Sequence, residues 1–176
     1  MDYEATVGAG ETFRYGAIAV VNDGRIKNVT VSGNVTITSA TEDTTMYVSG
    51  FVAESLGGQI EGDASRLQNS ISALDITITG GGTAYVGGYA GLVTRGAPSF
   101  SYGIATGTIT VTDVKKTYAG LLVGMSNGTC NWVLGSGEDP LIDYTYTITV
   151  DGVELAKYEA DGVTPKVDNF CGIAFE

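Results

Sequence analysis

The stretch Tyr85-Val86-Gly87-Gly88-Tyr89-Ala90-Gly91-Leu92-Val93 places a tyrosine ahead of small and apolar residues, and this pattern recurs along the chain. Related segments begin at Tyr15, Tyr47 and Tyr118, so that the leading tyrosines are 32, 38 and 33 residues apart. A shorter copy, Phe170-Cys171-Gly172-Ile173-Ala174, lies near the end of the sequence. Periods of about 20 to 50 residues are typical of solenoids, in which stacked repeats bury a shared core that one repeat could not bury alone.

Two further patterns recur in a constant order between these segments. The first is a glycine turn that leads into a β-forming residue, and the second is a strand in which apolar residues alternate with threonine. Three strand-like segments in a repeat of about 33 residues predict one coil of a parallel β-helix. The glycine turns are Asp23-Gly24-Arg25-Ile26, Gly57-Gly58-Gln59-Ile60 and Asn127-Gly128-Thr129-Cys130, and the threonine strands are Val35 to Thr38, Ile76 to Thr79, Ile109 to Thr112 and Tyr146 to Thr149.

Alternation within the threonine strands predicts which side chains face the core. Ile37, Ile78, Val111 and Ile148 each lie between two threonines. Because successive side chains of a strand point to opposite faces, we expect these four residues to form one interior column. The same parity in the tyrosine segments points Ile18, Val20, Leu121 and Val123 inward.

We predict an all-β chain that forms a single right-handed parallel β-helix, or β-solenoid, of about four coils. The hand follows because crossovers between parallel strands are nearly always right-handed. One domain is expected over residues 1–176, with repeats near 15–46, 47–84, 85–117 and 118–169 and a closing strand at 170–176. One short helix-like stretch covers Ala64 to Leu74.

Unequal repeat lengths indicate insertions at the corners of the coils. One covers Gly62 to Ser70, and a larger one runs from about Gly135 to Lys166. Within the larger insertion, the turn dipeptide Asp151-Gly152 separates the strand-like segments Tyr144 to Val150 and Val153 to Ala156, which predicts a hairpin-like C-terminal cap. A cap is expected because an open solenoid end exposes the edges of its sheets.

Composition limits the classes of partner. The net charge is −11 with only nine Lys and Arg residues, which disfavours nucleic acid and anionic membranes because both need clustered cations. No apolar run approaches the roughly 20 residues of a membrane-spanning helix, and no signal peptide is visible at the start of the sequence. We therefore expect a protein of the cell surface or extracellular space, as a fragment of a larger secreted chain, or a phage virion protein.

The residues that usually carry catalysis are scarce. The sequence has no histidine, which removes Ser-His-Asp and Cys-His catalysis and histidine-ligated zinc. Cys130 falls where other repeats have Ile26 and Ile60, so we interpret it as a small buried hydrophobic residue; whether it is bridged to Cys171 stays open. Gly80-Gly81-Gly82 lacks the lysine of a phosphate-binding loop and is interpreted as a turn.

Many β-helix proteins process polysaccharides, which requires two carboxylates about 5 to 10 Å apart. The acids of this chain gather in turns and insertions rather than on strands, so we predict no catalytic site and no cofactor. Calcium could use the oxygens near Glu138-Asp139 or Asp161-Gly162, although no calcium-loop spacing is met. The acids considered are Glu42, Asp43, Asp63, Asp113, Glu138, Asp139, Asp143, Asp151 and Asp161.

Two sets of outward residues are candidate binding faces. The first is a threonine ladder at spacings of about 4.8 Å between strands and about 7 Å along them, which resembles the face of β-solenoid ice-binding proteins. The second is an aromatic stripe that could stack on sugar rings or line a subunit interface. Both have structural alternatives, since threonine favours strands and like residues stack in any solenoid. The ladder comprises Thr36, Thr38, Thr77, Thr79, Thr110, Thr112, Thr147 and Thr149; the stripe comprises Tyr15, Tyr47, Tyr85, Tyr89, Tyr118 and Phe51.

Three segments resemble the GLUG repeat, whose Gly-Gly-Leu-Val-Gly-like core is followed by a Tyr-Ala-Thr-Gly-like turn. They are Gly87 to Val93, Tyr102 to Thr110 and Ala119 to Gly124, within a region from Tyr15 to Trp132. The segment Tyr47 to Glu54 lacks two motif glycines, and the region from Gly135 has no counterpart. The resemblance implies right-handed β-solenoids of large bacterial surface proteins, adhesins and some phage proteins, without a catalytic role for the repeat.

The sequence therefore predicts a non-catalytic structural or adhesive module that presents a binding or assembly face. Its expected partners are glycans, cell-surface proteins or virion proteins, and it is compatible with a homo-oligomer. Two alternatives stay open: an ice-binding protein that uses the threonine ladder, and a polysaccharide-processing β-helix enzyme.

Overall fold

The computed structural model describes residues 2–56, 59–61, 71–94, 99–101, 104–127, 147–156, 160, 162 and 172–175. Within this part of the chain the structure is all-β, and its strands form four sheets. Sheet A contains β1 (Asp2–Val7), β5 (Thr30–Ser39), β9 (Ile71–Thr79), β14 (Thr108–Thr112), β17 (Thr147–Val150) and β18 (Val153–Glu154), with β13 (Ile104–Ala105) also paired to β9. Sheet B contains β2 (Thr12–Gly16), β6 (Thr45–Ser49), β10 (Thr83–Gly87), β15 (Lys116–Gly120) and β19 (Ile173–Phe175). Sheet C contains β3 (Ala19–Asn22), β7 (Val52–Ser55), β11 (Ala90–Val93) and β16 (Val123–Ser126), and sheet D contains β4 (Arg25–Lys27), β8 (Gln59–Glu61) and β12 (Ser99–Ser101).

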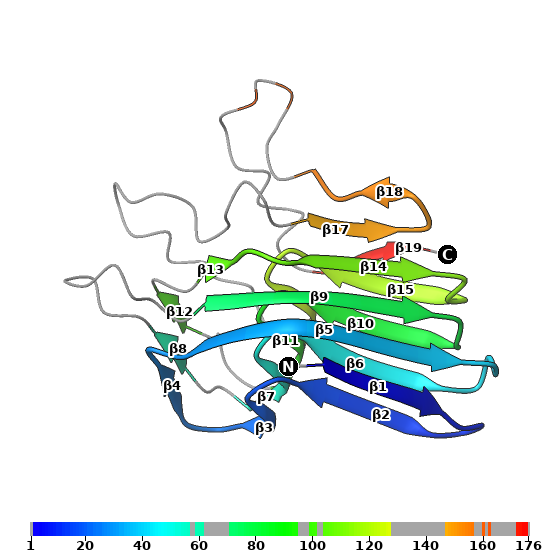
Figure 1. Cartoon of the computed structure of the whole chain (residues 1–176), viewed down its shortest axis with the longest axis horizontal. Helices are drawn as coiled ribbons and strands as arrows, with labels where there is room; N and C mark the ends of the chain where they lie inside the picture. Colours follow the sequence, from blue (N-terminus) through cyan, green and yellow to red (C-terminus); the bar gives the residue numbers. More distant parts are fainter. Residues whose placement is uncertain are drawn as a thin grey trace.

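The chain visits the sheets repeatedly in the order A, B, C, D, and we call each circuit a pass. Pass 1 comprises β1 to β4, pass 2 comprises β5 to β8, pass 3 comprises β9 to β12, and pass 4 begins with β14, β15 and β16. Each pass pairs in parallel with the one before, so equivalent strands lie side by side (Figure 1). The all-β class and the parallel pairing of repeats are as predicted, and this stacking is β-solenoid-like.

Inward side chains of sheets A, B and C meet in one apolar core, with sheet A in front of sheet B in Figure 1. In sheet A, Ile37 pairs with Ile78 and Ile78 with Val111, as expected, and all three are fully buried. The next member of that column is Val150 rather than Ile148. Ile148 lies in the neighbouring buried column beside Ile109.

The cause of this error is the two-residue period of a strand. A shift of two residues keeps every side chain on its face, so the pattern Thr147-Ile148-Thr149-Val150 could be placed in either register from sequence. The burial of Ile148 is therefore predicted correctly, but the residue with which it pairs on β14 is Ile109 and not Val111 as predicted.

Two glycines of the repeated pattern allow successive passes to approach closely. A Cβ placed on Gly91 would lie 2.8 Å from the backbone nitrogen of Val48, and one on Gly124 would lie 2.3 Å from that of Val86. In both cases the obstructing atom belongs to a sheet-B strand of the preceding pass. Steric contact between passes, rather than turn geometry, therefore explains why this position is a glycine.

Pass 1 departs from the predicted burial. Ile18 and Val20 were expected to point inward, but they are 37% and 50% exposed, whereas Leu121 and Val123 are buried as predicted. The physical reason is position: β1 to β4 are the edge strands of their sheets, so within the described structure each has a neighbouring strand on one side only.

The opposite end of sheets A and B carries antiparallel strands. The predicted hairpin forms, since β17 and β18 pair across Asp151-Gly152, whose positive φ values of 45° and 82° suit a tight hairpin turn. β19 pairs antiparallel with β15, so the last copy of the tyrosine pattern does not continue the parallel stack. Ile71 to Leu74, predicted to be helix-like, belong to β9.

Some predictions fall outside the described residues. These include the insertion at Gly62 to Ser70 and most of the insertion from Gly135 to Lys166. Within the described part, no helix has the length and apolarity needed to cross a membrane.

Candidate functional site

The outer face of sheet A carries two columns of threonine. One column comprises Thr6, Thr38, Thr79 and Thr112 on successive strands. The second comprises Thr36, Thr77, Thr110 and Thr149, with Glu4 at its β1 end. Together they form a grid two residues wide, which we call the threonine face.

The predicted ladder is corrected at Thr6, Thr147 and Thr149. Thr6 extends the first column, although the sequence analysis did not include it because the first repeat was taken to begin at Tyr15. Thr147 was aligned with Thr110 and Thr149 with Thr112, but Thr147 pairs with Thr108 and Thr149 pairs with Thr110, so both lie two residues out of the predicted register. The sequence does indicate Thr6, because it lies between the apolar residues Ala5 and Val7, as Thr36, Thr77 and Thr110 lie between apolar residues. This segment pairs with Ile37-Thr38-Ser39.

Hydroxyl contacts tie neighbouring threonines together in the first column. Thr6 Oγ1 lies 3.4 Å from Thr38 Oγ1, and Thr79 Oγ1 lies 3.4 Å from Thr112 Oγ1. A third outward column flanks the threonine face, where Thr108 donates its hydroxyl and backbone N–H to Asp75 Oδ1 at 2.8 and 3.0 Å.

In the second column, the described part of the structure records no side-chain hydrogen bond for Thr36, Thr77 or Thr110, and the first two are exposed. Their hydroxyls therefore remain available to a ligand or to water.

The face is uncharged over its central strands. On β5, β9 and β14 the two columns contain threonine alone, and each underlying inward residue is a buried aliphatic side chain. Short β-branched side chains have few rotamers, so the position of each hydroxyl and methyl group is set by the sheet. Such an arrangement can present a periodic surface of hydroxyl and methyl groups with little loss of side-chain entropy on binding.

An aromatic column runs along the outer face of sheet B. Tyr47, Tyr85 and Tyr118 are in register on β6, β10 and β15. Their rings stack with centroids 4.9 and 5.0 Å apart and planes within 8° and 6° of parallel. Burial and the neighbouring tyrosines raise the pKa of Tyr85.

Tyr15 is not part of this column. Arg14 pairs with Tyr47, whereas Tyr15 pairs with Val48, faces the core and is only 8% exposed. The alignment on tyrosine was one residue out, and a one-residue shift moves a side chain to the other face. Tyr15 instead stacks on Tyr3 with a centroid separation of 5.1 Å.

The ring faces of the aromatic column are already in contact with other groups. Both faces of Tyr85 lie against neighbouring rings, the Arg14 guanidinium lies 5.2 Å from the Tyr47 centroid, and Lys116 Nζ lies 5.2 Å from that of Tyr118. A sugar that stacks on tyrosine needs an open ring face. What these half-buried rings present to solvent is edges and hydroxyls, which suits the structural interpretation of the stripe.

Tyr89 and Phe51 do not belong to any outer face. Both are fully buried, and their rings stack on each other with a centroid separation of 5.0 Å. They lie just after the sheet-B strands at the corner that leads into sheet C, where the chain bends and side chains turn inward. Their predicted role in contact is therefore wrong.

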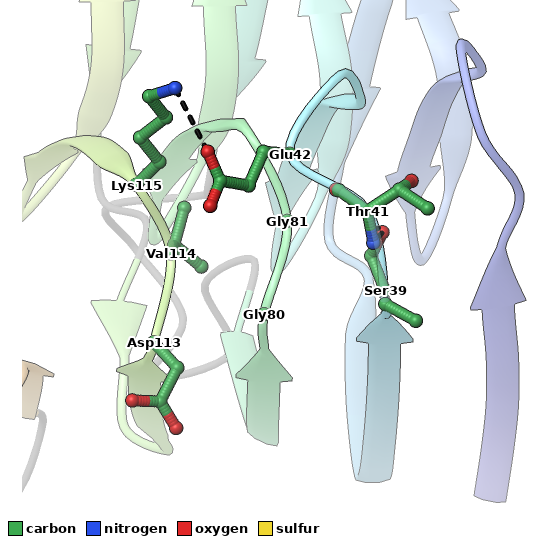
Figure 2. Close-up of a pocket in the computed structure, with 9 residues that line it drawn as sticks. Ser39, Thr41, Glu42, Gly80, Gly81, Asp113, Val114 and Lys115 are labelled. Carbon is green, nitrogen blue, oxygen red and sulfur yellow. Dashed lines mark hydrogen bonds and ion pairs between the residues drawn. The ribbon is translucent and has the colours of Figure 1, made fainter.

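A shallow hollow that the sequence analysis missed lies where the chain turns from sheet A into sheet B (Figure 2). Its polar groups include Glu42 and Lys115, which form an exposed ion pair at 2.9 Å, and Asp113, which points away from that pair. The glycines Gly80 and Gly81 have φ values of 71° and 116°, as their prediction as a turn requires. The hollow is open, and Glu42 and Lys115 pair with each other across it, so it offers no enclosed site.

Metal and thiol chemistry find no support in the described residues. No group of three or more potential metal ligands occurs there. The candidate calcium oxygens at Glu138, Asp139 and Asp161, as well as Cys130 and Cys171, lie outside the described residues.

Comparison with known proteins gives no assignment: no family model, no curated protein and no solved structure matches the chain significantly. The resemblance to the GLUG repeat stays a prediction.

Proposed function

We propose that this chain forms a right-handed parallel β-helix of about four coils and acts as a non-catalytic structural or adhesive module. Its place would be on a bacterial surface protein or in a phage virion, where it presents a flat face for binding or assembly. The observation that supports the proposal best is the threonine face, which extends in register over β1, β5, β9, β14 and β17.

The threonine face is a better candidate for contact than the aromatic column. In its second column, the hydroxyls of Thr36, Thr77 and Thr110 have no hydrogen-bond partner among the described residues, whereas the tyrosine rings of the aromatic column are stacked on one another. A rigid scaffold beneath the face favours binding because little conformational entropy is lost. We therefore assign the binding face to sheet A and a scaffold role to the tyrosines.

A binding experiment on glycan arrays, bacterial surfaces and virion proteins tests the proposal. Thr77→Lys places a long charged side chain in the middle of the face, and we expect it to weaken binding by about tenfold or more. Tyr85→Ser on the opposite sheet is the matched control and should leave binding unchanged. If Tyr85→Ser abolishes binding while Thr77→Lys has no effect, the assignment of the face is wrong.

The alternative of a polysaccharide-processing enzyme is tested in the same samples. Incubation with the bound glycan should release no new reducing ends and no unsaturated products. Any turnover that survives purification of the chain would contradict the non-catalytic assignment.

Ice binding is the second candidate, favoured by the two in-register threonine columns. Strands about 4.8 Å apart and alternate residues about 7 Å apart give a regular two-dimensional array of hydroxyl and methyl groups. A face of this kind could order water as ice does. Thermal hysteresis would be measured for the wild type, for Thr77→Leu and Thr110→Leu, and for Tyr85→Ser as a control. Ice binding requires hysteresis in the wild type and the control and its loss in both threonine variants.

A further inference from the structure

The three tyrosines of the aromatic column are held where they can react with one another. Tyr47, Tyr85 and Tyr118 occupy equivalent positions on adjacent parallel strands of sheet B. Their ring centroids lie 4.9 and 5.0 Å apart, with planes within 8° and 6° of parallel. Equivalent side chains of parallel strands leave the sheet in the same direction, so the carbons ortho to each hydroxyl lie beside those of the next ring. The column is therefore a series of phenols in contact, one on each of three passes.

Phenols in contact are the starting arrangement for a tyrosine–tyrosine cross-link. A one-electron oxidant converts a phenol into a phenoxyl radical, and the phenolic proton passes to water. Two neighbouring radicals then couple through a carbon–carbon bond between their ortho carbons. The hydrogen on each of these carbons is replaced onto the oxygen as a proton, which restores both phenols. The pair loses two electrons and two protons in all.

The coupling requires the rings to turn but does not require the strands to move. A bond between ortho carbons keeps the two ring centres nearly as far apart as they already are in the stack. The torsion that turns a tyrosine ring is soft, and the three rings of the column are only half-buried, so each has room to twist toward solvent. Holding two reacting groups in contact also gives the intramolecular reaction a large advantage over a bimolecular one.

The surroundings of the column disfavour coupling between two copies. The outer ring faces at its ends are occupied, because the Arg14 guanidinium lies 5.2 Å from the Tyr47 centroid and Lys116 Nζ lies 5.2 Å from that of Tyr118. Each copy also carries a net charge of −11, which repels a second copy. Radicals formed in the column therefore meet a partner within the same chain first.

The other described tyrosines are less suited to this reaction. Tyr3 and Tyr15 stack with centroids 5.1 Å apart, but their planes differ by 30°, they come from different sheets, and the Tyr15 hydroxyl is buried. Tyr89 is fully buried against Phe51, which is not a phenol. Among the described tyrosines, only those of the column combine register, near-parallel planes and access for an oxidant.

We propose that the aromatic column is a site of oxidative modification, at which a one-electron oxidant such as the oxidised haem of a peroxidase joins Tyr85 to Tyr47 or to Tyr118 by a dityrosine bond. With hydrogen peroxide as the terminal oxidant, each bond formed reduces one peroxide molecule to two water molecules, which accounts for the two electrons and the two protons. The bond fastens two successive passes, because it joins residues that are 38 or 33 positions apart in the sequence.

Treatment of the full chain with a haem peroxidase and hydrogen peroxide, at low protein concentration, tests the proposal. The monomer is isolated by gel filtration, dityrosine is measured by its fluorescence, and mass spectrometry identifies peptide pairs whose joint mass is lower by two hydrogen atoms. We expect pairs that contain Tyr47 with Tyr85 or Tyr85 with Tyr118. Tyr85→Phe keeps the stacked ring but removes the phenol that both pairs share, so the yield of these pairs should fall by about tenfold or more. Tyr3→Phe is the matched control at an exposed tyrosine outside the column, and it should leave the yield unchanged.

The double variant with Tyr47→Phe and Tyr118→Phe leaves Tyr85 without a phenol neighbour in the column, and it should lose the cross-link as Tyr85→Phe does. Circular dichroism checks that each variant is folded. The urea midpoint of the cross-linked wild type should rise, because the bond closes a loop in the unfolded chain, whereas peroxidase-treated Tyr85→Phe should show no rise.

A wild-type monomer without a cross-link in the column overturns the proposal, as does dityrosine found only in covalent dimers. A yield that persists in both column variants, or that falls as much in Tyr3→Phe, places the reaction at other tyrosines and also overturns it. Because the experiment needs no ligand of the threonine face, its failure is distinct from failure of the proposed function.

Discussion

Replacement of Ile78 by alanine tests the shared interior of the stack. Ile78 is fully buried and lies in a column between Ile37 and Val111, which are also fully buried. The change removes three carbon atoms, and at about 0.8 kcal/mol for each the transfer term is about 2.4 kcal/mol. The residual cavity adds to this, so we expect the free energy of unfolding to fall by about 3 to 4 kcal/mol, within the range of about 2 to 5 kcal/mol for such changes.

Urea denaturation followed by circular dichroism measures this loss, with Thr77→Ala as the matched control. Thr77 is the next residue on the same strand but is exposed, so its replacement should cost less than about 1 kcal/mol. The midpoint should shift while the slope of the transition stays constant. If Ile78→Ala costs no more than Thr77→Ala, Ile78 does not face a packed interior and the stacked core is refuted.

Three further changes test the contacts between passes, the buried tyrosine and the surface. Gly124→Ala should lower the free energy of unfolding by about 2 to 3 kcal/mol, because its Cβ would lie 2.3 Å from a backbone atom. The control is Gly24→Ala, whose Cβ would have its nearest neighbour 3.8 Å away and which should change the free energy of unfolding by no more than about 0.5 kcal/mol. Equal urea midpoints for the two variants would contradict this expectation. Burial raises the pKa of Tyr15, so the folded chain loses stability as the pH rises through that raised pKa, above the ordinary value of 10.0. Tyr15→Phe removes a buried hydroxyl that has no hydrogen-bond partner. It should therefore reduce the loss of stability at high pH, and it should raise the free energy of unfolding at neutral pH by up to about 1 kcal/mol, as measured in thermal melts. A large destabilisation would show that the hydroxyl does have a partner. Lys115→Ala breaks an exposed ion pair with Glu42 and should change the free energy of unfolding by less than about 0.5 kcal/mol at 0.15 M salt. A loss of about 2 kcal/mol would refute the interpretation of the turn between sheets A and B as a solvated surface.

Much of the architecture could be predicted because it follows from local sequence patterns. Threonine alternating with isoleucine or valine indicates an extended strand with one buried face, and its return in four repeats indicates stacked strands. The burial of Ile37, Ile78, Val111 and Ile148 follows from that alternation alone. The outward position of the threonines follows from the same rule.

The candidate site was predicted less completely, because it depends on which residues are neighbours across passes. Tyr15 was aligned one residue out and turned out to be buried, and Thr147 was aligned two residues out and stayed on the outer face in another column. Thr6 was missed because β1 pairs with β5 ahead of the first recognised repeat. Tyr89 and Phe51 are aromatic like the residues of the exposed column, so the sequence does not distinguish them from it. Their burial follows from the bend of the chain between sheets B and C.

By itself, the sequence determined the all-β class, the repeated strands and the face on which each strand residue lies, because backbone geometry makes side chains alternate regardless of what surrounds the strand. Tertiary structure alone decided the register between passes, the stacking of the tyrosine rings and the exposure of Val20. All three features depend on the distance between backbone segments that are far apart in sequence, and no local sequence pattern contains that distance. The same apolar residue is buried where another pass lies against it and exposed where none does.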